Sequence, residues 1–290
     1  MPGPRHWRIF GVDFPSRPRA RKPITIAAGQ IQAHGFTLEK IEELRDWESY
    51  ETWLRQPGPW LAGFDFPFGL PREAVADLGW PQNWKALVLH CRSLGREQFC
   101  ETLNRYREGR PPGKRYAHRA VDIPAKSHSP LKLVNPPVGL MFLEGVPRLL
   151  DAGISVPGLF EGDPGRLAFE AYPGFTARRI FRGSYKNDSV AKQTPARQRA
   201  RKLIVDCLAS TGNPFGFRLK GSPSLLASLV RDATGDRLDA VICAMQAAWA
   251  WQRQEENYGL PRNIDPLEGW ILMVPEAGSD RLQGPKKGHP

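Results

Sequence analysis

The chain has 290 residues, of which 41% are hydrophobic and 24% are charged, a balance that excludes a disordered or fibrous protein. A chain of this length buries roughly three quarters of the surface that it exposes when unfolded, which is enough for a self-standing core. The sequence holds no run of 18 uncharged apolar residues, so we expect no membrane span. The N-terminal segment lacks the apolar core of a signal peptide, and we expect a soluble, cytoplasmic protein.

The chain is strongly basic. Its 41 Lys and Arg residues against 30 Asp and Glu residues leave a formal net charge of +11. This balance favours a polyanionic partner such as a nucleic acid, although composition alone equally allows a basic protein without one. The four cysteines form no CxxC pair, which indicates neither a zinc knuckle nor a disulfide framework.

The first part of the chain is predicted to contain strands around one helix. Three apolar, β-prone runs predict strands: residues 7–14, 24–28 and 60–66. A basic turn over 16–23 separates the first two, and residues 30–36 are either the hairpin partner of the second strand or its continuation. Apolar residues at helical spacing predict a helix over 38–54.

The middle of the chain lacks a sustained periodic pattern of apolar residues. Residues 84–104 predict a helix, whereas 105–137 mix basic residues, prolines and single apolar residues and indicate a long loop. We interpret about 72–165 as an insertion into a single domain that spans 1–276. Residues 277–290 have the composition of a disordered tail.

The last part of the chain is predicted to be mainly helical. The expected helices are 195–209, 222–231 and 236–254, with strands over 167–172 and 269–274. The helix over 236–254 is rich in alanine and apolar on most faces, so it must pack against the sheet.

Three of the predicted strands carry a carboxylate in an apolar context shortly before a proline. These residues are Asp13, Asp65 and Glu170. A carboxylate in such surroundings is costly unless it is paired, protonated or bound to a metal. Each one taken singly could also be a turn-former.

The helix over 236–254 opens with two more acids. Asp236 and Asp239 are three residues apart and therefore share one face of the first turn. Without any catalytic role, Asp236 could be the N-cap of the helix and Asp239 an acid that the helix dipole favours. Packing of this helix on the sheet would nevertheless bring its N-terminus close to Asp13 and Asp65.

The order of these acids resembles that of RNase H-like nucleases, and GDRLDA is similar to the corresponding helix start of RuvC-type Holliday-junction resolvases. Four segments resemble more specifically the domain of unknown function 429 family, which comprises predicted nucleases: GVDFPS, GFDFPFGLP, FEAYPG and GDRLDAVICAMQAAWAW. The resemblance covers most of residues 7–275. It implies an α/β fold with an RNase H-like mixed sheet flanked by helices, and a large helical and loop insertion after the Asp65 strand.

The resemblance also implies an activity: hydrolysis of phosphodiester bonds in DNA or RNA by a two-metal-ion mechanism with Mg²⁺ or Mn²⁺. Asp13 would bridge the ions, Asp65 would bind one, and Asp239 the other with help from Asp236. Glu170 would be a metal ligand, a base that orients water, or an acid behind the ligands. These five acids are the candidate catalytic residues. Resolvases of similar fold act as dimers, so a homodimer is possible.

Basic residues with interleaved tyrosines in the irregular segment predict a channel for a nucleic-acid backbone. The candidate contacts are Arg107, Arg115 and Arg119, with Lys126 and Lys132 near the scissile phosphate. Two other functions remain open: a non-catalytic nucleic-acid-binding protein on an RNase H-like core, and a phosphotransferase of the actin/sugar-kinase superfamily. The second lacks support, because no glycine-rich phosphate loop follows Asp13 or Asp65. The sequence leaves open the choice between DNA and RNA and between endo- and exonuclease action.

Overall fold

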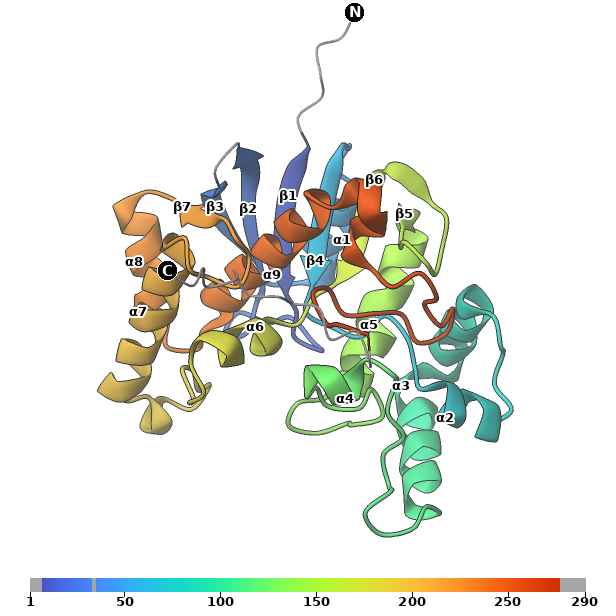
Figure 1. The fold of residues 1–290 in the computed structure, drawn as a ribbon. Helices are drawn as coiled ribbons and strands as arrows, with labels where there is room; N and C mark the ends of the chain where they lie inside the picture. The colour runs from blue at the N-terminus through green and yellow to red at the C-terminus, as the bar shows by residue number, and fades with distance from the viewer. Residues whose placement is uncertain (1–6, 33–34, 277–290) are drawn as a thin grey trace, which may run out of the picture.

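The computed structural model describes residues 7–32 and 35–276, and within them a seven-stranded mixed sheet forms the centre of the molecule (Figure 1). The strand order is β5-β6-β4-β1-β2-β3-β7. β1, β2 and β3 pair antiparallel, whereas β1, β4, β6 and β5 form a parallel set and β7 runs parallel to β3. The strands are β1 Arg8–Asp13, β2 Ile24–Gln32, β3 Gly35–Leu44, β4 Trp60–Phe64, β5 Ile154–Ser155, β6 Asp163–Glu170 and β7 Arg218–Lys220.

Helices flank both faces of this sheet. They are α1 Trp47–Leu54, α2 Arg72–Asp77, α3 Trp84–Glu108, α4 Asp122–Ala125, α5 Val138–Asp151, α6 Pro173–Ile180, α7 Pro195–Ala209, α8 Pro223–Arg231 and α9 Asp236–Trp251. Two short 3₁₀ segments, Val190–Lys192 and Gln254–Gly259, complete the elements of the described residues. None of the helices in the described part is long and apolar enough to cross a membrane.

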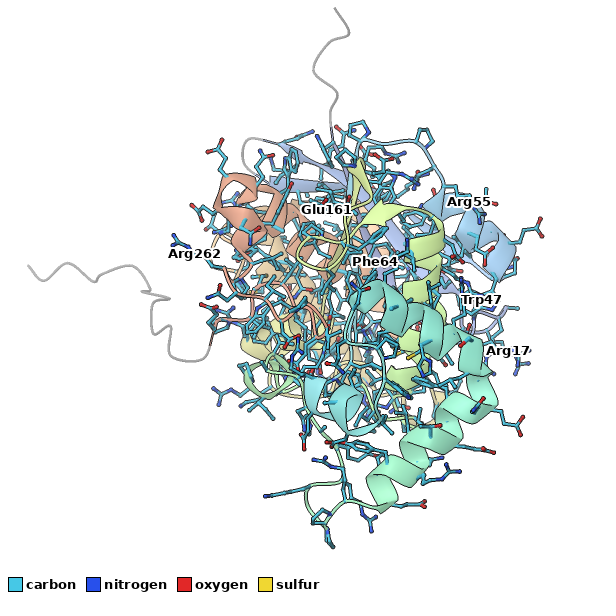
Figure 2. All side chains as sticks on the ribbon, turned by 90° about the vertical axis from the view of Figure 1, so that its right-hand side faces the viewer. Arg17, Trp47, Arg55, Phe64, Glu161 and Arg262 are labelled. Carbon is cyan, nitrogen blue, oxygen red and sulfur yellow. The ribbon has the colours of Figure 1, made fainter. Side chains whose placement is uncertain are left out.

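The side chains of β1 alternate between two cores, as strand geometry requires. Phe10 and Val12 pack with side chains of α1, α3 and α5 on one face. Ile9 packs with side chains of α7, α8 and α9 on the other. Figure 1 shows α9 crossing this second face. Phe64 of β4, labelled near the centre of the view in Figure 2, is fully buried. The sheet therefore separates the region rich in insertion helices from the face that carries α9.

α9 lies directly on the backbone of the two central parallel strands. Gly11 of β1 and Gly63 of β4 are neighbours in register. A Cβ atom at Gly11 would lie 2.0 Å from the amide nitrogen of Ala244, and one at Gly63 would lie 2.5 Å from the carbonyl oxygen of Cys243. The helix can approach this closely only because both strand positions lack a side chain.

The predicted strands over 7–14, 24–28 and 60–66 are confirmed, as are the helices over 195–209, 222–231 and most of 236–254. The helix expected over 38–54 is wrong in its first part, where residues up to 44 belong to β3. The pairing of β3 with β2 shifts between Ala28 and Gly29, which leaves Glu39 as an extra residue. This bulge changes the side-chain alternation, so that Leu38 and Ile41 acquire a helix-like spacing within a strand.

Other expectations concern the insertion and the C-terminal part. Residues 72–165 contain α2 to α5, β5 and the start of β6, and α3 extends to Glu108, past the expected end at 104. The strand predicted over 269–274 is wrong, because only Ile271 forms an isolated parallel bridge, with Glu170. The tail predicted over 277–290 lies outside the described residues.

Candidate active site

Two of the predicted acids lie at the same ends of adjacent parallel strands. Asp13 is the last residue of β1, and Asp65 directly follows β4. The amide of Asp65 donates a hydrogen bond to the carbonyl of Val12 at 2.9 Å, which continues the strand pairing up to both carboxylates. Alternation along β1 gives Asp13 the same face as Gly11, the face on which α9 lies.

The N-terminus of α9 brings the other two aspartates to this place. Gly235, with φ of +79°, allows the chain to enter the helix, and Asp236 and Asp239 follow in its first turn. The Asp236 side chain is almost buried and that of Asp239 is fully buried. Burial raises the pKa of Asp13 well above its ordinary value, and repulsion from Asp236 and Asp239 raises it further. The four aspartates therefore form one electrostatic group, which we call the acid cluster.

Two further carboxylates of the acid cluster, those of Asp65 and Asp236, also have raised pKa values. Burial raises the pKa of Asp65 to about 7, with repulsion from Asp239 and Glu170 adding to the effect. Burial likewise raises the pKa of Asp236, although the ammonium group of Lys22 opposes it. Raised carboxyl pKa values show that the protein does not fully compensate the charge of this group.

Two lysines partly compensate the negative charge of the acid cluster. Lys22 donates to Asp236 at 2.7 Å and to Asp188 at 2.9 Å. Lys186 forms an ion pair with Asp239, and the hydroxyl group of Tyr185 donates to the same carboxylate at 2.5 Å. Sequence reasoning missed these residues. For Lys22 the basic turn after the Asp13 strand was an available signal, but the segment around Lys186 carries no motif that predicts its place.

Ammonium groups already occupy part of the acid cluster. Among the described residues, no group of three or more His, Cys, Asp or Glu side chains is arranged to hold a metal ion. The α9 carboxylates are hydrogen-bonded to ammonium groups instead. When every group is ionised, four aspartates and two lysines leave an excess of two negative charges.

Glu170 has hydrogen-bond partners that differ from those of the acid cluster. It shares the face of Ala168, which packs with the core opposite α9. Arg119 donates to both of its carboxylate oxygens, at 2.6 and 2.7 Å, and the amide of Phe68 donates to one of them at 2.9 Å. Both oxygens of Glu170 therefore already accept hydrogen bonds from the protein, although its negative charge still raises the pKa of Asp65.

The expectation that Arg119 contacts nucleic acid is wrong. Its side chain is only 2% exposed and is paired with Asp122 and Glu170. It also donates to the carbonyl of Glu268 at 2.9 Å. The guanidinium group thereby joins the start of α4 to the end of β6 and to the C-terminal segment, which is a structural role.

The four remaining basic candidates form no hydrogen bond or ion pair with the acid cluster in the described residues. Arg107 is half-buried in the last turn of α3 and donates to the hydroxyl of Tyr116 at 2.6 Å. Arg115 and Lys126 are exposed, and Lys132 lies 3.4 Å from a ring nitrogen of His128. The C-terminal half of α3 extends away from the sheet (Figure 1). Contact of these residues with nucleic acid stays a prediction.

Comparison of the chain with protein-family models, curated proteins and solved structures gives no match. Its function is therefore inferred from the residues of the acid cluster and from their surroundings.

Proposed function

We propose that the protein is a metal-dependent nuclease of RNase H-like fold, similar to the domain of unknown function 429 family, that hydrolyses phosphodiester bonds in DNA or RNA. The observation that carries this proposal is the convergence of four aspartates from the ends of β1 and β4 and the start of α9 into one buried group, in which the pKa values of Asp13, Asp65 and Asp236 are raised. The mixed α/β sheet flanked by helices is compatible with that fold. The net charge of +11 supports a polyanionic substrate.

The donor set of the acid cluster fits Mg²⁺ or Mn²⁺. Carboxylate oxygens are the ligands that hard divalent cations prefer. The excess of two negative charges equals the charge of one such ion, and a bound cation would favour the ionised forms whose pKa values are now raised. When bound, these metals activate water and stabilise the leaving oxygen of a phosphodiester.

Each residue of the site would have a distinct task. Asp13 and Asp65 project from rigid, paired strands and would fix the position of the cation. Asp239 would release the ammonium group of Lys186 and bind the metal ion in its place, while the hydroxyl of Tyr185 keeps the carboxylate oriented. The freed ammonium group of Lys186, whose side chain is 41% exposed, could then contact a phosphate oxygen of the substrate.

Metal titration of Asp13→Asn beside the wild type tests the proposal. Mn²⁺ should raise the melting temperature Tm of the wild type relative to EDTA, because a ligand that binds only the folded state stabilises it. Asp13→Asn should be at least as stable as the wild type in EDTA, since it removes a buried, repelled charge. It should show neither a metal-dependent rise in Tm nor Mn²⁺-dependent cleavage of single-stranded, duplex, hybrid or branched substrates.

Asp206→Asn is the matched control, since Asp206 is an exposed carboxylate on α7 that pairs with Lys202. It should retain the metal response and the cleavage. Equal metal responses in Asp13→Asn and the wild type would overturn the proposal.

The two lysine pairs favour a second candidate, a non-catalytic nucleic-acid-binding protein on the same core. Lys22 and Lys186 satisfy Asp236 and Asp239 without any metal. In this case the wild type should bind nucleic acid, and Mn²⁺ should change neither the stability nor the binding of the wild type or of Asp13→Asn.

A further inference from the structure

A cavity of about 390 Å³ adjoins the acid cluster, between the turn after β1 and the start of α9. Its wall includes polar and charged side chains from the turn after β1, from β2, from α8 and from the α8–α9 connection and start of α9: Arg21, Thr25, Ser228, Arg231, Thr234 and Asp236. Asp236 belongs to the acid cluster itself, and Thr25 is the cross-strand partner of Asp13. The volume lies in the range of about 300–1,000 Å³ that is typical of ligand pockets.

The acids in the cavity wall are already satisfied by the protein. Glu43 accepts from the guanidinium group of Arg237 at 2.8 Å. Asp232 accepts from the hydroxyl of Thr234 at 2.7 Å and from the amide of Arg237 at 2.9 Å. Asp236 accepts from Lys22. Each carboxylate of the cavity wall therefore already accepts hydrogen bonds from the protein, and Glu43 and Asp232 leave no demand for a cation inside the cavity.

Two arginines of the wall are free. Within the residues that the structure describes, the guanidinium groups of Arg21 and Arg231 form no hydrogen bond or ion pair, and both residues are exposed. A guanidinium group is a planar fork of donors that matches the oxygens of a phosphate. The positive end of the α9 dipole adds to the favourable potential for an anion.

The turn after β1 directs neighbouring cations to different places. Arg19 and Lys22 exchange two backbone hydrogen bonds, at 2.9 and 3.1 Å, and so close a tight hairpin around Arg21. Lys22 reaches the acid cluster, whereas Arg21 lines the cavity. One short turn thus supplies a counter-ion to the acids and a free donor beside them.

We propose that this cavity is a phosphate-binding subsite in which Arg21 and Arg231 hold a phosphate group of the substrate strand, next to the phosphodiester on which the acid cluster acts. This inference rests on the proposed nuclease function. Contacts of this kind position the backbone and are independent of base sequence. The subsite would fix the register of the strand relative to Asp13 and Asp236.

Fluorescence anisotropy in EDTA tests the subsite without the metal. A labelled single-stranded oligonucleotide is titrated with the full chain, with the double variant Arg21→Gln/Arg231→Gln, and with the control Arg17→Gln/Arg262→Gln. Both double variants remove two positive charges. Arg17 and Arg262 are exposed, lie at opposite sides of the molecule in Figure 2, and do not line the cavity.

The cavity variant should bind the oligonucleotide about tenfold more weakly and lower the slope of log Kd against log salt by about 1 to 2, one for each lost phosphate contact. The control should change the Kd much less. Equal Kd values for the two double variants, or no binding by the wild type, would overturn the inference. Displacement of the oligonucleotide by an equal concentration of a nucleoside monophosphate would assign the cavity to a free nucleotide and overturn the strand assignment.

The metal response separates this inference from the proposed function. The cavity variant keeps all four aspartates, so its Mn²⁺-dependent rise in Tm should equal that of the wild type. A wild type that binds the oligonucleotide through Arg21 and Arg231 but shows no metal response would uphold the subsite and contradict the metal-dependent nuclease.

Discussion

The ammonium group of Lys186 forms an ion pair with the carboxylate of Asp239 in the first turn of α9. The Asp239 side chain is fully buried, whereas that of Lys186 is 41% exposed. The cation can move into solvent while the carboxylate is fixed by the helix and by Tyr185. The pair thus compensates the buried carboxylate in the protein without a metal, and it would compete with the proposed metal ion for the same oxygens.

Lys186→Met should weaken the metal-free protein and strengthen metal binding. Without the ammonium group, the buried carboxylate of Asp239 keeps only part of its hydrogen bonding, which should lower the free energy of unfolding by about 1–3 kcal/mol. Calorimetric titration should give a lower Kd for Mn²⁺ than in the wild type. Lys202→Met is the control, because it breaks an exposed pair on α7. If Lys186→Met bound Mn²⁺ with the same Kd as the wild type, Lys186 would not compete with the metal for Asp239.

The pKa of Asp65 predicts a pH dependence of stability. It is about 7 in the folded protein against an ordinary value of 3.8, so between these values the folded state binds more protons than the unfolded state. Stability in EDTA should therefore fall as the pH rises from about 4 to 7 and then level off. Urea unfolding at pH 5 and pH 8 measures this fall in the free energy of unfolding, and the fall should be smaller in Asp65→Asn. An equal fall in Asp65→Asn and the wild type would contradict the raised pKa of Asp65.

Gly11→Ala should displace α9 and with it Asp236 and Asp239. The added Cβ atom would lie 2.0 Å from the amide nitrogen of Ala244 and 2.1 Å from the carbonyl oxygen of Ala240. Such overpacking should cost at least about 1–3 kcal/mol in the free energy of unfolding and reduce the Mn²⁺-dependent rise in Tm. Gly212→Ala, where nothing lies within 4 Å of the added atom, should affect neither quantity.

Arg119→Met should destabilise the fold without a specific effect on nucleic-acid binding. Removal of the guanidinium group leaves Asp122 and Glu170 buried and unpaired, which should cost about 3–5 kcal/mol. In urea unfolding, the double variant Arg119→Met/Glu170→Gln should lose less free energy of unfolding than the two single variants lose together. The second change removes one of the buried charges that Arg119→Met leaves without a cationic partner. A surface role for Arg119 would instead give weaker binding with unchanged stability.

Much of this fold could be predicted from the sequence. The strands that end at Asp13 and Asp65 are short apolar runs closed by prolines, and α7 and α9 have strong helical patterns. The failure at Leu38 has a specific cause, since a bulge at Glu39 gives part of β3 a spacing of three. A local pattern cannot reveal such a bulge, because it depends on the pairing with β2.

The candidate site was predicted only in part. Strand-end carboxylates and an acidic helix start are local signals, so the four aspartates could be singled out. The lysines that compensate them come from loops whose positions depend on the tertiary fold. The position of Arg119 in an irregular, basic segment predicts a surface cation, and only the fold reveals its buried partners Asp122 and Glu170.

The acid cluster combines the first strand of the sheet with the last long helix. During synthesis Asp13 and Asp65 leave the ribosome long before α9, and domains of this kind acquire their structure as units once their parts are available. Docking of α9 must bring these like charges together, and we expect their repulsion to slow that step. Lys22 and Lys186 both precede α9 in the chain and can already lie at its docking site. The same two cations that compensate the acids in the finished protein would therefore lower the barrier to its completion.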